Sequence, residues 1–273
     1  MENSLKYFKN LYSKIAANSE NHLFNFLNIK YGICSKDYYL KDDLIFNTKE
    51  IQEIECFFKD LSSGVPFEYI VNQASFYDSE FFVDERVLIP RPETELIIDY
   101  FKSLKTNKNF NIIDAGTGSG CIGISIANLC NQNIVFGVDK YLRSIEIAKI
   151  NKNKLNANNN FKLLVGDWLL LFKKNSIDMV ISNPPYITED DEHLKHLKHE
   201  PLTSLVSTDN GLKDIKIIIK QSKQVLKKSG KLIIEHGFNQ AQDIENILKD
   251  YNYRNIFNIK DYQDHQRIIV AEL

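Results

Sequence analysis

Residues 1–62 carry apolar side chains at helical spacing. Positions three and four residues apart lie on one helix face, and the first such stripe consists of Leu5, Phe8, Leu11, Tyr12 and Ile15. A second stripe begins at Leu23, and a third extends from Ile51 to Leu61, shortly before Gly64, a residue that favours a helix stop. The pattern predicts a small helical domain over residues 1–64.

The hydrophobic pattern changes after residue 64. Aromatic and β-branched residues dominate positions 66–89, which predicts a connecting β-hairpin within residues 65–92. The segment Pro90-Arg91-Pro92-Glu93-Thr94-Glu95 then leads into apolar positions that start at Leu96. Because proline and acidic residues are typical of a helix N-terminus, we expect a helix to open the second domain, residues 93–273.

Short apolar runs alternate with amphipathic stretches from residue 110 onward. The runs cover residues 110–113, 134–138, 161–165, 177–181, 232–234 and 256–259. Strand–helix alternation of this kind predicts an α/β fold, a mostly parallel, Rossmann-like sheet with helices on both faces. A last run at residues 268–270 follows the preceding strand closely, so we expect an antiparallel strand at the sheet edge.

Composition places the chain among ordinary globular proteins, since 43% of its 273 residues are hydrophobic and 26% are charged. The four cysteines, Cys34, Cys56, Cys121 and Cys130, form no CxxC pair, which favours reduced thiols. The N-terminus lacks a signal-peptide pattern, and no run of about 18 apolar residues is present. We therefore expect a cytoplasmic protein that does not engage a membrane.

Charge is distributed unevenly along the chain. Residues 1–85 hold 8 Lys, no Arg and 14 Asp or Glu, a net charge of −6, against +4 for the remainder. An acidic N-terminal region is a poor match for a phosphate backbone, so direct nucleic-acid binding is not expected there.

A glycine-rich loop follows the first predicted strand. Its sequence is Asp114-Ala115-Gly116-Thr117-Gly118-Ser119-Gly120, and a helix-like segment follows at once. Glycines allow a tight turn and close approach to a ligand, and the helix N-terminus offers free N–H groups. Asp139, at the end of the second strand, can accept hydrogen bonds from both ribose hydroxyls. These features predict a nucleoside site without separating a dinucleotide from S-adenosylmethionine; the alternative is a plain strand-to-helix turn.

The third strand ends in Gly166-Asp167-Trp168, on the side of the sheet that faces the ligand crevice. Asp167 could accept a hydrogen bond from the exocyclic amine of adenine. Trp168 could lie against the ring or be a core aromatic, and its position favours neither.

Asn183-Pro184-Pro185-Tyr186 follows the fourth strand. Two prolines fix two φ angles and remove two N–H donors, so the loop is stiff and its carbonyls are available. The Asn183 side-chain oxygen and the Pro184 carbonyl can hold the two hydrogens of an –NH₂ group, with the Tyr186 ring against a flat substrate. The alternative is a rigid strand-exit turn.

This arrangement suits methyl transfer to a planar nitrogen. An amide nitrogen is a weak nucleophile because its lone pair is delocalised. Holding its hydrogens on acceptors aims it at the methyl carbon for in-line displacement and favours the positive charge that develops. The sulfonium donor is already activated, so no dedicated base is required before attack.

The glycine loop and the Asn-Pro-Pro-Tyr segment resemble the HemK/PrmC family, the protein-(glutamine-N5) methyltransferases of peptide-chain release factors. Further matching segments, in the same order, are Ile89 to Glu95, Glu200-Pro201-Leu202, Asp209-Asn210-Gly211-Leu212 and Glu235-His236-Gly237. The resemblance covers residue 60 to the C-terminus. It implies a glutamine in a Gly-Gly-Gln loop of release factors as acceptor. Because the catalytic domain lacks an obvious docking surface, we expect the helical N-terminal domain to recognise the substrate protein. S-adenosylmethionine is implied as donor and S-adenosylhomocysteine as product.

The resemblance also implies cofactor contacts at Gly116 to Gly120, Asp139, Trp168 and Asn183. Arg91 and Glu95 either face the cofactor or anchor the hairpin, and Glu235 and His236 either line the pocket or have a structural role. His193, His196 and His199 recur every three residues among acidic neighbours, a pattern typical of a solvated face, so no metal site is predicted.

Two other functions remain open at this point. An amino-methyltransferase acting on adenine in DNA or guanine in RNA would use the same tetrapeptide, because the exocyclic amine has similar geometry. A non-catalytic nucleoside-binding module would need only the glycine loop and Asp139.

Overall fold

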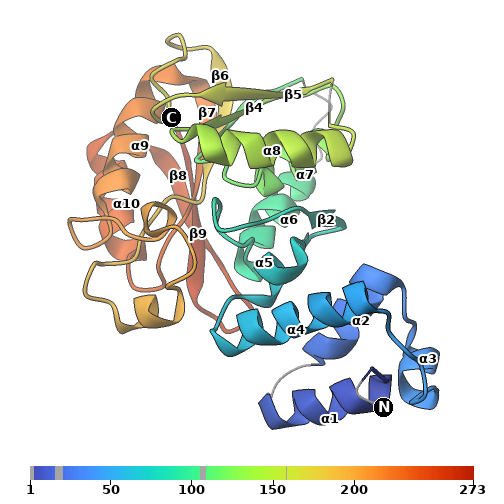
Figure 1. Ribbon diagram of the computed structural model, residues 1–273. Helices are drawn as coiled ribbons and strands as arrows, with labels where there is room; N and C mark the ends of the chain where they lie inside the picture. Colours follow the sequence, from blue (N-terminus) through green and yellow to red (C-terminus); the bar gives the residue numbers. More distant parts are fainter. Residues whose placement is uncertain (1–2, 16–20, 105–108, 158) are drawn as a thin grey trace. The chain divides into compact units, whose positions relative to one another are not determined.

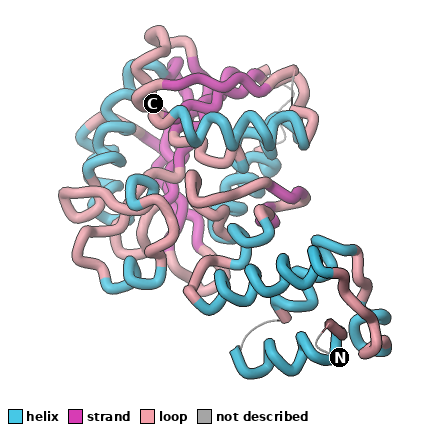
Figure 2. Tube along the Cα trace, in the orientation of Figure 1, coloured by secondary structure: helices cyan, strands magenta, loops and turns pink. Residues whose placement is uncertain are grey.

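The computed structural model describes residues 3–15, 21–104, 109–157 and 159–273. The chain divides into two compact units, Met1–Gln73 and Ala74–Leu273, shown in Figure 1 and, by secondary structure, in Figure 2. Among the described residues no helix is long and apolar enough to cross a membrane.

The first unit is helical. Its helices are α1 (Leu5–Ile15), α2 (His22–Tyr31), α3 (Ser35–Leu40), α4 (Thr48–Ser62) and α5 (Phe67–Val71). Aromatic rings fill the core, where Phe26 and Phe57 stack with ring centroids 4.4 Å apart. Asn47 begins α4 with a capping box. The Asn47 side chain accepts a hydrogen bond from the Glu50 backbone N–H, and the Glu50 side chain accepts one from the Asn47 backbone N–H.

Helix α5 corrects the expectation of β-structure from residue 66. Pro66 precedes its first turn, and Asn72, at φ 55°, ends it in the left-handed conformation. Tyr69 and Val71 are buried, and the helix contacts α2 and α4. Packing against helices therefore outweighs the β-propensity of an aromatic and β-branched run. The hairpin itself is short, with β1 (Ala74–Phe76) paired to β2 (Ser79–Phe81).

The second unit is built on a seven-stranded sheet in the order β5-β4-β3-β6-β7-β9-β8. The strands are β3 (Asn111–Ala115), β4 (Ile134–Asp139), β5 (Phe161–Val165), β6 (Ile177–Ser182), β7 (Leu226–Glu235), β8 (Arg254–Lys260) and β9 (Gln266–Glu272). Neighbours from β5 to β7 are parallel, as predicted.

The last strand is antiparallel, as expected, but it does not lie at the edge. β9 pairs with both β7 and β8, and β8 occupies the edge. The burial pattern gives the reason: residues 268–271 of β9 are buried on both faces, whereas β8 alternates exposed and half-buried positions. A strand apolar on both faces belongs inside a sheet.

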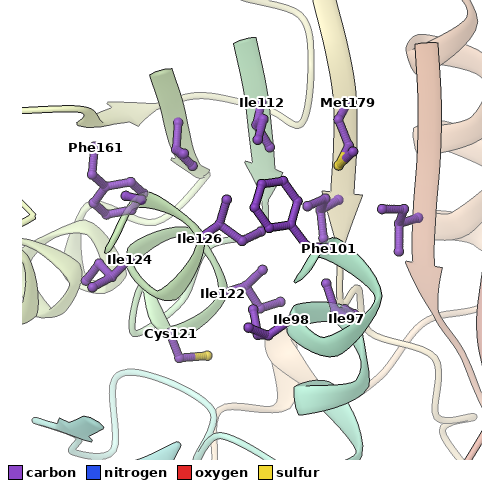
Figure 3. Close-up of a cluster of buried hydrophobic side chains, with 14 of the residues drawn as sticks. Ile97, Ile98, Phe101, Ile112, Cys121, Ile122, Ile124, Ile126, Phe161 and Met179 are labelled. Atoms are coloured by element: carbon purple, nitrogen blue, oxygen red, sulfur yellow. The ribbon is translucent and has the colours of Figure 1, made fainter. Parts of the chain in front are cut away.

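Helices cover both faces of the sheet (Figure 1). Along β3, Ile112 faces a cluster shared with α6 (Glu95–Ser103) and α7 (Cys121–Leu129), shown in Figure 3. Ile113 faces the opposite cluster, shared with α9 (Lys213–Val225) and α10 (Ala241–Asp250). Helix α8 (Leu142–Lys154) contacts α7, β4 and β5. The fold is thus doubly wound, with the helix alternation that the pattern predicted.

The strand order changes direction between the parallel neighbours β3 and β6. From β3 the chain proceeds outward to β4 and β5, and from β6 to β7 on the other side. In such sheets ligands bind beyond the carboxyl ends of the strands at this switch point. The glycine loop follows β3 and the Asn-Pro-Pro-Tyr segment follows β6, so the topology brings these two loops together.

Candidate active site

A cavity of about 280 Å³ lies at the carboxyl ends of β3, β4, β5 and β6, lined entirely by residues of the second unit. The predicted site residues that line it are Gly116, Thr117, Gly118, Ser119, Asp139, Asp167, Trp168, Asn183 and Pro185. Residues from four loops, distant in sequence, thus share one pocket.

Three predicted site residues do not line the cavity: Gly120, Pro184 and Tyr186. Gly120 is the N-cap of α7 at φ 84°, and a Cβ there would lie 2.9 Å from the side chain of Ile124 and 3.3 Å from that of Ala148. Its conformation and close packing serve the backbone turn. Pro184 is buried in the strand-exit turn, and Tyr186 points its hydroxyl to Glu235.

Asp114, the last but one residue of β3, holds the glycine loop by hydrogen bonds. Its Oδ2 accepts hydrogen bonds from the Thr117 hydroxyl at 2.6 Å and from the Gly123 N–H at 2.9 Å. Its Oδ1 is buried without a hydrogen-bond partner. Burial raises the pKa of this carboxyl to about 6, although both hydrogen bonds act in the opposite direction. Asp114 therefore fixes the loop from a position behind the cavity wall.

Asp139 lines the cavity and is oriented by two backbone donors. Its Oδ2 accepts from the Gly118 N–H at 3.1 Å and its Oδ1 from the Tyr141 N–H at 2.9 Å. The carboxylate thus faces the cavity as a hydrogen-bond acceptor, the kind of group that a ribose diol requires.

Trp168 lies between the cavity and the hydrophobic core. It lines the cavity and also packs against the buried cluster beneath α9 and α10. A Cβ added to Gly116 would lie 3.1 Å from its ring, so the indole rests against the glycine loop. Asp167 is exposed, with Lys140 Nζ 4.0 Å from its carboxylate. Trp168 thus offers an aromatic face beside the loop that precedes α7.

Asn183 presents its side chain to the cavity in a defined direction. Its Nδ2 donates to the Thr94 hydroxyl at 3.1 Å. Thr94 in turn donates to Glu235 Oε2 at 2.6 Å, and the Tyr186 hydroxyl donates to Glu235 Oε1 at 3.2 Å. Burial, followed by the charge of Glu235, raises the pKa of the Tyr186 phenol, which therefore stays protonated. With Nδ2 engaged, the Asn183 Oδ1 remains as an acceptor.

The backbone of the Asn-Pro-Pro-Tyr segment is held from its other side. Gln240 Nε2 donates to the carbonyls of Tyr186 at 3.1 Å and Asn210 at 3.0 Å. Gly211, at φ 77°, lies so close that a Cβ there would overlap the Tyr186 carbonyl oxygen. The Asp209-Asn210-Gly211 segment is therefore a brace for this loop.

The residues whose roles the sequence left open are now placed. Arg91 lines the cavity and also pairs with the buried Glu200, which accepts from the Ile89 N–H at 3.1 Å. Glu95 anchors the hairpin by accepting from the Tyr77 N–H at 2.8 Å. His236 is buried, with Nδ1 2.9 Å from the Gly237 carbonyl.

Sequence reasoning did not single out several cavity residues, among them Leu88, Pro90, Thr94, Cys121, Thr203, Ser204, Val206 and Asp214. Thr94 lies within the segment from Ile89 to Glu95, which was interpreted as a helix start and as a match to the family, without a role for Thr94 itself. A threonine near two prolines is only a weak indication of a site residue, because the same residues are typical of a helix N-terminus. Within the described residues, no group of three His, Cys, Asp or Glu is arranged to hold a metal ion.

The fold and the matching domain model define the class of protein. Residues 106–270 match a model described as a methyltransferase domain. The second unit's fold is shared by a methyltransferase from Pyrococcus furiosus (TM-score 0.52, 13% identity, covering 83% of this chain and 98% of that one). It is also shared by the hMettl16 catalytic domain (TM-score 0.58, 17% identity, covering 70% and 74%). The chain is an S-adenosylmethionine-dependent methyltransferase of the Rossmann-like class.

Three relatives narrow this class. Release factor glutamine methyltransferases of Buchnera aphidicola (subsp. Acyrthosiphon pisum) and Coxiella burnetii are 35% and 33% identical, with 84% and 86% of this chain covered and 85% of each relative. The release factor glutamine methyltransferase of Escherichia coli K12 is 31% identical, and the match covers 82% of this chain and 81% of that relative. The chain belongs to the release factor glutamine methyltransferase family.

Proposed function

We propose that this protein methylates the side-chain amide nitrogen, N5, of the glutamine in the Gly-Gly-Gln loop of peptide-chain release factors. The observation that carries the proposal is the orientation of Asn183. Its amide nitrogen is bound to Thr94, so its Oδ1 is left as an acceptor beside the glycine loop. The names of the relatives support a release factor as the protein substrate.

The cavity fits S-adenosylmethionine. Three glycines with positive φ, Gly116, Gly118 and Gly120, let the loop after β3 turn tightly, and without side chains at these positions its backbone can approach a ligand closely. Asp139 has acceptor capacity for the ribose, and Trp168 offers a flat face beside Asp167 for the adenine. When bound, S-adenosylmethionine supplies a methyl group already activated on a sulfonium.

The chain's own residues then hold the glutamine amide. Asn183 Oδ1, at the cavity, accepts one of its N–H groups. Pro184 is itself buried beside the cavity lining, and we propose its backbone carbonyl as the acceptor of the second N–H, with the two prolines keeping both acceptors in place. Both acceptors favour the positive charge that develops on the nitrogen as its lone pair forms the new bond to carbon. One amide proton leaves afterwards to solvent.

The proposal is tested by incubation with labelled S-adenosylmethionine and a release factor, either wild type or with its loop Gln replaced by Ala. Label is expected on the wild-type factor alone. Asn183→Ala should reduce labelling by about 100-fold or more, since it removes one preorganised acceptor. Asn246→Ala, on the exposed side of α10, is the matched control and should label normally. Equal labelling of both release factors, or of neither, would contradict the proposal.

A second candidate is methylation of an exocyclic amine on a nucleic-acid base, because the same two acceptors fit a planar –NH₂ group. Its support is confined to that geometry. Transfer of label to DNA or RNA, with none to release factor, would favour it.

A further inference from the structure

Glu235 is a buried carboxyl that does not line the cavity. It ends β7 with 1% of its surface exposed, and both of its oxygens accept hydrogen bonds, Oε2 from Thr94 and Oε1 from Tyr186. A buried carboxylate is costly unless it is well paired. Both of its partners belong to, or touch, the Asn-Pro-Pro-Tyr segment, so its position behind that loop calls for a function.

Thr94 connects Glu235 to Asn183. A threonine hydroxyl has one hydrogen and two lone pairs. Because the hydrogen lies on the 2.6 Å bond to Glu235, the oxygen can only accept from Asn183, at 3.1 Å. Asn183 must therefore turn its –NH₂ toward Thr94 and its Oδ1 away from it. The carboxylate thus decides which end of the Asn183 amide meets the substrate.

We infer that Glu235 is a positioning residue for methyl transfer: acting through Thr94, it sets the direction of the Asn183 amide, and it anchors Tyr186 from the same side. The inference rests on the proposed function, since it concerns how the acceptor amide is held. Glu235 touches neither substrate nor cofactor, so its effect reaches the reaction through these two residues.

The ionised form is the one that does this. A protonated Glu235 can donate to the Thr94 oxygen, which frees the Thr94 hydrogen to bond to Asn183 Oδ1. The reversed amide would then direct –NH₂ hydrogens toward the hydrogens of the substrate amide, an unfavourable pairing of donors.

Several groups face Glu235 and adjust its pKa. Burial raises the pKa to about 7, the bonds from Thr94 and Tyr186 lower it, the charge of Glu93 raises it and that of Arg267 lowers it. Cys121, on α7, also interacts with Glu235, and burial keeps this thiol protonated by raising its pKa to about 12. Because the ionised form of Glu235 is the active one, the rate of methyl transfer should rise as the pH passes through the pKa of Glu235.

The test compares Glu235→Gln, Thr94→Val and the double variant with wild type on release factor. Each single variant should lower kcat by at least about 10-fold, as removal of orienting contacts behind a site does. The dissociation constant for S-adenosylhomocysteine, measured by calorimetry, should change less than about 2-fold for Glu235→Gln. The double variant should lose no more than the worse single one, because both remove the same link. Thr94→Ser keeps the hydroxyl and should restore activity.

Two readouts separate positioning from simple damage. The wild-type kcat should rise with an apparent pKa near that of Glu235, and this rise should be absent in Glu235→Gln. The side-chain ¹⁵N resonance of Asn183, assigned by its loss in Asn183→Asp, should titrate over the same range in wild type and stay constant in Glu235→Gln. If Glu235→Gln does not fold, Thr94→Val and Thr94→Ser make the same comparison.

The outcomes are distinct. A wild-type enzyme that leaves release factor unlabelled overturns the proposed function, whereas the Asn183 resonance still reports on the link to Glu235. Unchanged kcat and pH profile in Glu235→Gln, or losses that multiply in the double variant, overturn the positioning role alone.

Discussion

Two buried carboxyls lie behind the two functional loops, Asp114 behind the glycine loop and Glu235 behind the Asn-Pro-Pro-Tyr loop. Burial raises the pKa of each, to about 6 and about 7. A carboxyl whose pKa is raised by folding binds its proton more tightly in the folded state. Its contribution to stability is therefore complete below the unfolded-state pKa and is lost as the pH rises through the folded-state value.

This sign gives a prediction for Glu235→Gln. The free energy of unfolding of wild type, relative to the variant, should fall between pH 5 and pH 8, by on the order of 3 kcal/mol at most for a shift of this size. Urea unfolding at pH 5, 6, 7 and 8 measures it. The variant lacks the titrating carboxyl, so the test is how the difference in unfolding free energy between wild type and variant depends on pH. A difference that stays constant from pH 5 to pH 8 would contradict a raised pKa for Glu235.

Trp168 gives a second prediction at the same scale, since it is the single tryptophan of the chain. Its ring lines the cavity beside Gly116, so binding of S-adenosylhomocysteine should change its fluorescence directly. Trp168→Phe should lose the signal yet keep calorimetric affinity within about 10-fold, because one aromatic face replaces another. Trp168→Ala should bind more weakly than Trp168→Phe. If the Trp168 emission spectrum does not change when S-adenosylhomocysteine binds, the cofactor binds away from this ring.

The local motifs could be predicted from sequence, but the links between them could not. The glycine loop, Asp139 and Asn183 follow strands whose hydrophobic runs are visible, so their convergence at one sheet edge follows from the topology. The bond from Thr94 to Glu235 joins residues 141 positions apart. Neither residue has a local pattern that indicates the other, and only the packed fold brings them together.

At the scale of elements, the strands of the parallel half were the most predictable, because each is a short, mainly apolar run. The run at residues 161–165 is β5 at both bounds. Expectations were wrong where packing decides between alternatives, as in α5, which contacts α2 and α4, and in β9, which lies inside the sheet. Helix α3 (Ser35–Leu40) was not predicted, since six residues give too short a period to recognise.

The brace formed by the loop at Gly211 yields a prediction with a matched control. Gly211→Ala combines a left-handed backbone with an overlap on the Tyr186 carbonyl, whereas Gly32, at φ 70°, has open space around its Cβ position. Both alanine variants should lose about 1–3 kcal/mol of unfolding free energy through backbone strain. Gly211→Ala alone should also lower kcat, because Tyr186 and the preceding prolines must shift. Equal kcat in the two variants would show that the brace is not needed for catalysis.

For the whole molecule, the acidic bias is placed differently from the expected N-terminal domain. Residues 1–73 hold 8 Lys and 10 Asp or Glu, a net charge of −2, while residues 74–85 hold four acidic residues and no basic one. Most of the negative charge therefore belongs to residues 74–85, the hairpin of the second unit and the segment directly after it. The charge argument against nucleic acid applies to that hairpin more than to the helical unit.

The cavity is lined by residues 88–214 alone, so cofactor binding should not need the first unit. We propose that this unit recognises the release factor. A chain of residues 74–273 should then bind S-adenosylhomocysteine within about 2-fold of the full chain by calorimetry, with a KM for release factor raised at least about 10-fold, the equivalent of roughly 1.4 kcal/mol of lost binding.

A short peptide containing Gly-Gly-Gln supplies the control for this truncation. It is too small to use a separate recognition unit, so both chains should methylate it with the same kcat/KM, provided that circular dichroism shows the truncated chain folded. Loss of activity on the peptide together with loss of cofactor binding would mean that residues 1–73 support the fold of the catalytic unit. An unchanged KM for release factor would instead place recognition within residues 74–273, where the acidic hairpin and the cavity rim would have to provide it.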